Sequence, residues 1–298
     1  MKKYFLYQVD AFTKKIFTGN PAGVVSNADG LSDSDMQKIA RELNNSETAF
    51  IFSGDDDCDV HVRFFTPTSE VPICGHATIA AHYVRAKKLN LPNQTVVRQK
   101  TGAGILPVTI LNNGNDYQVV MEQGKISVEK ISAAAHEKIL AALGLSIDDR
   151  NKNCPAAIAS TGHSKVMIGI DDLEKLHALE PNLQALAEIS REINCNGYYV
   201  FVLTPDENFL VHGRMFAPAI GIAEDPVTGN ANGSLGAYLC HFGLIDTRGD
   251  KVTFHAVQGE KIQRRGTMRV EVSLHDNQPM KVKIFGEAVI TFKTAIEV

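Results

Sequence analysis

The chain has 298 residues, of which 44% are hydrophobic and 21% charged, as is typical of a globular protein with a packed core. Its formal net charge of −4 provides no basic surface for nucleic acid or acidic lipid, and no apolar run approaches the roughly 20 residues of a membrane span. Five irregularly spaced cysteines without a CxxC pair argue against a zinc site or disulfide framework and fit a reducing compartment, so we expect a cytoplasmic protein with no nucleic-acid or membrane partner.

The first half of the chain predicts a helix, a strand and a core helix, in that order. Residues 48–52 form an apolar run that favours a strand. Residues 77–86 are apolar on all sides except at His82 and Arg85, which is typical of a core helix. Short β-branched stretches follow and predict strands, and the turn signal at residues 112–115 predicts a hairpin.

The second half repeats this order after about 150 residues, a domain-sized period. Its first matching helix carries Leu186 and Ile189 where the earlier helix carries Met36 and Ile39, the apolar spacing of a helix face. Three pairs of blocks match in the same order: residues 41–44 with 191–194, 63–67 with 214–218, and 70–77 with 224–231. We therefore interpret the chain as a tandem duplication of one domain.

Each copy predicts a curled, mainly antiparallel sheet around a central helix, which gives an α+β fold of two similar domains. The boundary is expected near residues 123–131, so we assign residues 1–125 to the first domain and 126–286 to the second. The last apolar stretch has no counterpart at the end of the first half. Residues from about 287 to 298 are therefore assigned to the first domain, where they would complete its sheet.

Two helices begin at matched points, one around Gly75 and the other around Gly229. A helix N-terminus offers free backbone N–H groups and a partial positive charge, and glycine allows a ligand close approach. If the two copies face each other, both helix starts enter one cleft that suits a carboxylate substrate. The alternative is that these glycines only allow core helices to pack.

The two copies differ in their titratable groups. Glu47 and His76 occur only in the first copy, where the second has Gly197 and Asn230, and Asp225 occurs only in the second. A carboxylate base, an imidazole and a second carboxylate suit proton transfer. Taken singly, each residue also has an ordinary structural explanation. No HxxxH, HExxH, GxGxxG or Walker motif occurs, so we expect neither a metal nor another cofactor.

Several segments together resemble the PhzF-like, or phenazine-biosynthesis-like, family, and most of all its YddE-type members. The matching segments span most of the chain in the expected order: Val9 to Thr13, Gly19 to Val24, Ser46 to Phe50, Arg63 to Pro67, Cys74 to Thr78 and Glu224 to Asn230. The resemblance implies a diaminopimelate-epimerase-like fold, an isomerase and a homodimer.

The resemblance also implies roles for individual residues. In the family's phenazine enzyme a glutamate moves a proton between carbons of a cyclic dienoic acid, and Glu47 stands at that position. The family's histidine and aspartate match His76 and Asp225, so these three form the expected catalytic set. The expected substrate-binding set is Asn20, Ser46, Gly75, Gly229 and Asn230, with Asn230 in place of a serine.

Three functions follow as hypotheses. The leading one is a cofactor-independent isomerase that moves a proton on a small carboxylic acid, with Glu47 as acid and base. The second is a racemase or epimerase that uses Cys74. Epimerases of this fold use two opposed cysteines, and Thr228 holds the second place here, which disfavours it. The third is a non-catalytic protein that binds a metabolite.

Overall fold

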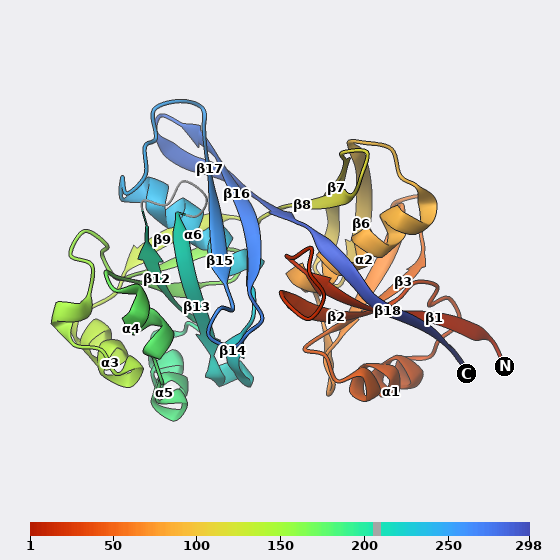
Figure 1. Ribbon diagram of the computed structural model, residues 1–298, viewed down its shortest axis with the longest axis horizontal. Coiled ribbons are helices and arrows are strands. Elements are labelled where there is room, and N and C mark those ends of the chain that lie inside the picture. Colours follow the sequence, from red (N-terminus) through yellow and green to blue (C-terminus); the bar gives the residue numbers. More distant parts are fainter. Residues whose placement is uncertain (205–209) are drawn as a thin grey trace. The chain divides into compact units, whose positions relative to one another are not determined.

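Two units of similar construction form the described part of the chain, residues 1–204 and 210–298 of a computed structural model (Figure 1). Unit 1 comprises Met1–Glu122 and Phe285–Val298, and unit 2 comprises Gln123–Ile284. In each unit, strands surround one central helix, so the predicted α+β class is confirmed.

Unit 1 is a mainly antiparallel sheet. Its elements are β1 (Lys3–Ala11), β2 (Asn20–Val25), α1 (Asp33–Leu43), β3 (Thr48–Ser53), β4 (Val60–Phe65), β5 (Glu70–Val71), α2 (Gly75–Leu89), β6 (Thr95–Thr101), β7 (Gly104–Asn112), β8 (Tyr117–Glu122) and β18 (Ala288–Glu297). The strands pair in the order β18–β1–β2–β3–β4–β6–β7–β8, and β5 adds to β4. Only the β2–β3 and β4–β6 pairs of this order are parallel.

Unit 2 follows the same plan with additional helices. Its elements are β9 (Ile126–Lys130), α3 (Ala133–Leu143), the 3-10 helix Ile147–Asp149, β10 (Ala157–Thr161), β11 (Lys165–Ile170), α4 (Leu173–Ala178), α5 (Leu183–Ile193), β12 (Tyr198–Leu203), β13 (Val211–Ala217), the 3-10 helix Pro218–Ile220, β14 (Ile222–Asp225), α6 (Gly229–His241), β15 (Lys251–Gln258), β16 (Gly266–His275) and β17 (Gln278–Gly286), which ends in unit 1. The order β9–β10–β11–β12–β13–β15–β16 is parallel only at β11–β12 and β13–β15. Both units thus share one pairing pattern, and β9 lies beside β10 as β18 lies beside β1.

The matching blocks of the sequence have matching local structure. Asn44 ends α1 and Asn194 ends α5, and each has a left-handed backbone with φ of 51°. Asparagine tolerates this conformation because its short side chain bonds locally. The buried faces of the two helices carry Met36 and Ile39 in one and Leu186 and Ile189 in the other. The shared Asn therefore directs the chain from a helix into a strand in both copies.

A repeated ion pair joins each copy's Arg to the Glu that follows it. In unit 1, Arg63 donates to both carboxylate oxygens of Glu70 at 2.7 and 2.6 Å. In unit 2, Arg214 donates to both oxygens of Glu224 at 3.0 and 2.8 Å. These are the residues that the sequence blocks aligned, so the repeat extends to side-chain contacts.

The central helices α2 and α6 are buried on most sides. α2 contacts β1, β2, β3 and β8, and α6 contacts β9, β10, β11 and β16. A Cβ added at Gly236 of α6 would lie 2.9 Å from side-chain atoms of both Val270 and Val272, so glycine here lets strand β16 approach the helix. Within residues 1–204 and 210–298, no helix has both the length and the apolar composition required to span a bilayer.

Candidate functional site

Four residues that the sequence singled out lie together in unit 1, at the start of α2. The His76 Nε2 atom is 3.4 Å from Glu47 Oε2, and the side chains are 9% and 17% exposed. The Cys74 Sγ atom is 3.5 Å from His76 Nδ1, and Ser46 Oγ is 3.2 Å from His76 Nε2. The imidazole therefore contacts a carboxylate, a hydroxyl and a thiol.

The loop between α1 and β3 holds Glu47 in this position. After the left-handed turn at Asn44, the side-chain amides of Asn45 and Gln8 exchange two hydrogen bonds of 2.9 Å. The backbone N–H of Gly23 in β2 donates to the Glu47 carbonyl at 3.2 Å. Because Thr48 then pairs with Gly23 in the parallel β2–β3 ladder, both ends of the loop are fixed.

The start of α2 is suited to an anion. Cys74 occupies the N-cap position without a side-chain cap hydrogen bond, and the first turn contains no acidic residue. A Cβ added at Gly75 would meet no atom within 4 Å, so space is open beside this residue. Uncapped N–H groups and the helix dipole both favour a negatively charged group here.

Asn20, the remaining predicted residue of unit 1, is fully buried at the start of β2. Strand β2 is the direct neighbour of β3, which Glu47 precedes. Its role in substrate binding stays a prediction.

In unit 2, Asp225, Gly229 and Asn230 lie at the end of β14 and the start of α6. Thr228 is the N-cap residue of α6, and its hydroxyl donates to the Asp225 carboxylate. The Asn230 Oδ1 atom is buried and has no hydrogen-bond partner among the residues that the structure describes. Since buried acceptors are normally satisfied, Asn230 is a place where a ligand donor would fit.

Gln258 forms hydrogen bonds with several of these groups, and no sequence pattern pointed to it. Its Nε2 donates to the Asp225 carbonyl at 2.8 Å and to the Thr228 hydroxyl at 3.1 Å. Its Oε1 accepts from the Thr228 backbone N–H and from Asn232 Nδ2, each at 3.1 Å. A glutamine on β15 thus positions the turn before α6, through contacts between distant segments that leave no local pattern.

Lys165 is a second residue that sequence reasoning missed. It is 7% exposed, and burial lowers its pKa below the usual range while Cys195 and Asp225 oppose this effect. A Cβ added at Gly197 would lie 2.3 Å from Lys165 Cδ. Gly197 is the counterpart of Glu47, so the second copy has a lysine side chain beside the position where the first has its carboxylate.

One group of potential metal ligands occurs in the described part of the chain, and it is the trio Glu47, Cys74 and His76. One donor atom from each lies within 4.8 Å of the others. Carboxylate, thiolate and imidazole are all zinc ligands. The three donors already contact through His76, so an ion would have to replace these contacts.

Comparisons with known proteins agree with the motifs. The family described as phenazine biosynthesis-like protein, PhzC-PhzF, matches residues 9–294. An uncharacterized isomerase of Clostridium acetobutylicum is 58% identical over 299 residues, covering 99% of each chain. The uncharacterized isomerase YddE of Escherichia coli K12 is 50% identical over 288 residues, covering 96% of each.

A crystal structure of a PhzF-family phenazine biosynthesis protein from Bacillus anthracis superimposes with a TM-score of 0.90. The two sequences are 31% identical, and each chain is covered completely. The predicted family resemblance is confirmed, and with it the prediction of an isomerase. The chain therefore belongs to the PhzC-PhzF family of phenazine biosynthesis-like proteins.

Proposed function

We propose that this protein is a cofactor-independent isomerase that moves a proton between carbon atoms of a small carboxylic acid, with Glu47 as acid and base. The observation that carries the proposal is the 3.4 Å contact of Glu47 with His76 at the open start of α2. A carboxylate that lies beside an uncapped helix start can exchange a proton with a substrate whose own negative charge is held by that helix.

The reaction needs only one proton and one conjugated substrate. The Glu47 carboxylate takes a proton from a carbon next to a carbonyl group or double bond, and the electron pair of that C–H bond enters the conjugated system. The Glu47 carboxylic acid then returns the proton to another carbon. Backbone N–H groups around Gly75 stabilise the negative charge that develops, and His76 orients the Glu47 side chain.

Further substrate contacts are part of the proposal. We propose Asn20 and Ser46 as substrate-binding residues of unit 1, and Asp225, Gly229 and Asn230 as substrate-binding residues of unit 2. The buried, unpartnered Oδ1 of Asn230 supports this assignment, because a substrate N–H or O–H would satisfy it. The proposal includes a homodimer in the cytoplasm, which sedimentation and cell fractionation test.

Proton exchange from carbon tests the proposal directly. The protein is incubated in D₂O with a panel of small unsaturated and 2-substituted carboxylic acids, and NMR follows deuterium entering C–H positions. We expect exchange with at least one acid, and a loss of about 10²–10⁴-fold in Glu47→Gln with binding of that acid retained. Full exchange by Glu47→Gln contradicts the proposed role of Glu47.

The contact between Cys74 and His76 keeps a second function in view, an epimerase with Cys74 as base. Cys74→Ala distinguishes the two. Under our proposal, Cys74→Ala keeps most of the exchange activity and Glu47→Gln loses it. An epimerase with Cys74 as base would show the opposite pattern. A protein that binds an acid from the panel without any exchange supports a non-catalytic role.

A further inference from the structure

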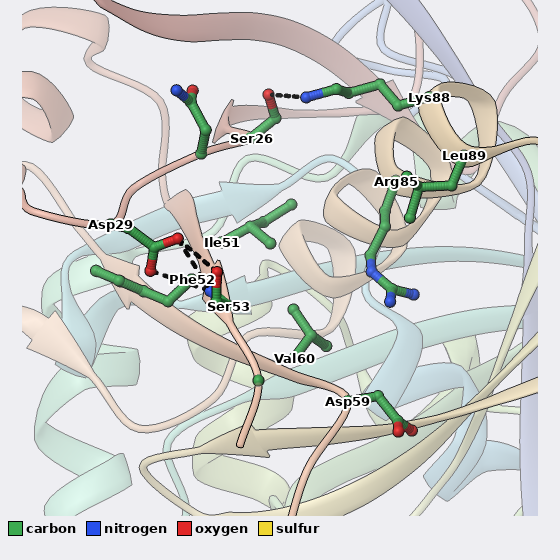
Figure 2. A pocket seen from close by; sticks show the side chains of 12 residues that line it. Ser26, Asp29, Ile51, Phe52, Ser53, Asp59, Val60, Arg85, Lys88 and Leu89 are labelled. Atoms are coloured by element: carbon green, nitrogen blue, oxygen red, sulfur yellow. Dashed lines mark hydrogen bonds between the residues drawn. The ribbon is translucent and has the colours of Figure 1, made fainter. Parts of the chain in front are cut away.

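A cavity of about 420 Å³ lies in unit 1 beside the C-terminal end of α2 (Figure 2). Arg85, Lys88 and Leu89 line it from α2, and further residues come from β3, from the start of β4 and from the loop after β2. Arg85 follows His76 by nine residues on the same helix, which corresponds to about 14 Å along the axis. The cavity is therefore separate from the Glu47–His76 cluster.

The two carboxylates of the cavity wall already have partners. Asp29 accepts from the Ser53 backbone N–H at 3.1 Å and from the Ser53 hydroxyl at 2.6 Å (Figure 2). Asp59 accepts from the backbone N–H of Arg98 at 2.7 Å and from its guanidinium at 3.3 Å. Neither carboxylate forms an ion pair with a cation of the wall.

The cations of the wall are less well satisfied. Arg85 Nη1 is buried without a hydrogen-bond partner among the described residues. Burial lowers the pKa of Arg85, and the negative charge of Asp59, which forms no ion pair with it, partly opposes this shift. Lys88 Nζ donates to the Ser26 hydroxyl at 3.0 Å. A buried guanidinium nitrogen without a partner is costly, so an anion at this position would stabilise the protein.

The remaining lining residues indicate the polarity and size of a ligand that would fit the cavity. Ile51, Phe52, Val60 and Leu89 present apolar side chains to the cavity. The volume lies in the range of pockets that hold small molecules. A monoanion suits the site better than a dianion, because Asp29 and Asp59 add negative charge to the same wall.

We propose that this cavity is an accessory binding site for a small monocarboxylate with an apolar body, in which Arg85 holds the carboxylate and Lys88 provides a second positive charge. The ligand's apolar part lies against Ile51, Phe52 and Leu89. The site is independent of the proton-transfer function proposed above, since it uses none of the same residues.

Benzoate is the probe that tests the site, with the full chain and NMR chemical-shift mapping. Wild type should show saturable shifts around residues 51–53 and 85–89. Arg85→Met should weaken binding at least tenfold, or about 1.4 kcal/mol. Lys87→Met is the matched control, because Lys87 is on the same helix and pairs with Asp116 outside the cavity lining; it should bind benzoate as wild type does.

Thermal unfolding gives a second, independent measurement of benzoate binding. Benzoate should raise the Tm of wild type and of Glu47→Gln, but not that of Arg85→Met, whose fold is checked by circular dichroism. No binding up to about 10 mM benzoate, equal binding by Arg85→Met, or shifts confined to residues 46–47 and 74–76 overturns the proposal. Stronger binding of inorganic phosphate than of benzoate overturns the choice of a monocarboxylate.

Discussion

Replacing Glu224 with Gln should destabilise the protein much more than the same replacement at Glu70. The two glutamates have equivalent places in the repeat, and each pairs with an arginine through two hydrogen bonds. Their surroundings differ. The side chains of Arg214 and Glu224 are 5% and 12% exposed, whereas those of Arg63 and Glu70 are 22% and 42% exposed.

Burial sets the expected magnitudes. Without the Glu224 charge, Arg214 stays buried with no anionic partner among the described residues, and its guanidinium keeps the carbonyls of Leu176, His177 and Leu179 as acceptors. Removing one member of a buried pair costs about 3–5 kcal/mol, and we expect about 3 because the Gln amide oxygen still accepts one bond. Arg63 retains Asp33 at 2.6 Å, so Glu70→Gln should cost about 1 kcal/mol or less.

Urea denaturation followed by circular dichroism measures both losses. The double variant Arg214→Met with Glu224→Leu should recover much of the loss, because it removes the uncompensated buried charge. Equal losses for Glu224→Gln and Glu70→Gln would refute the reasoning from burial. So would a double variant less stable than Glu224→Gln alone.

Two other predictions concern buried polar side chains. Burial lowers the pKa of His82 from 6.5 to about 4, although a contact of 2.6 Å with Gln99 opposes this shift. As pH falls, the imidazole of the unfolded chain therefore binds a proton before that of the folded protein, and the free energy of unfolding decreases. Between pH 7 and pH 4, urea titrations should show a decrease about 3 kcal/mol larger for wild type than for His82→Gln. Equal decreases for the two proteins would contradict this. A Cβ at Gly213 would lie 2.0 Å from the Tyr199 hydroxyl oxygen, so Gly213→Ala should cost about 1–3 kcal/mol in thermal unfolding. Tyr199→Phe should relieve part of that cost, and an unchanged Tm for Gly213→Ala alone would show that the tyrosine moves freely.

Much of the fold could be predicted because the duplication left paired signals in the sequence. The shared Asn at positions 44 and 194 marks two left-handed helix ends, and the shared Arg and Glu mark two ion pairs. Each signal depends on backbone conformation or on a contact within one copy. Because these features are local, residues that match between the two copies are enough to reveal them.

The candidate site could be predicted from the sequence only in part. Glu47 and His76 are in contact, and their joint action in catalysis stays a prediction. Gln258 and Lys165 contact segments far along the chain, and no sequence motif marks them. His82 and Arg85 stood out as polar residues on an apolar helix. Only the three-dimensional surroundings distinguish them, since His82 is in the core and Arg85 lines a cavity.

The pairing of β18 with β1 affects how the chain can be assembled on the ribosome. The ladder runs from Lys3 opposite Glu297 to Ala11 opposite Ala288, so β1, which is synthesised before unit 2, waits for β18, which is synthesised after it. All of unit 2 is made in between and is continuous in sequence. Unit 2 can therefore fold during synthesis, while β1 keeps an unpaired edge until β18 emerges. Unit 1 is therefore begun before unit 2 and completed after it.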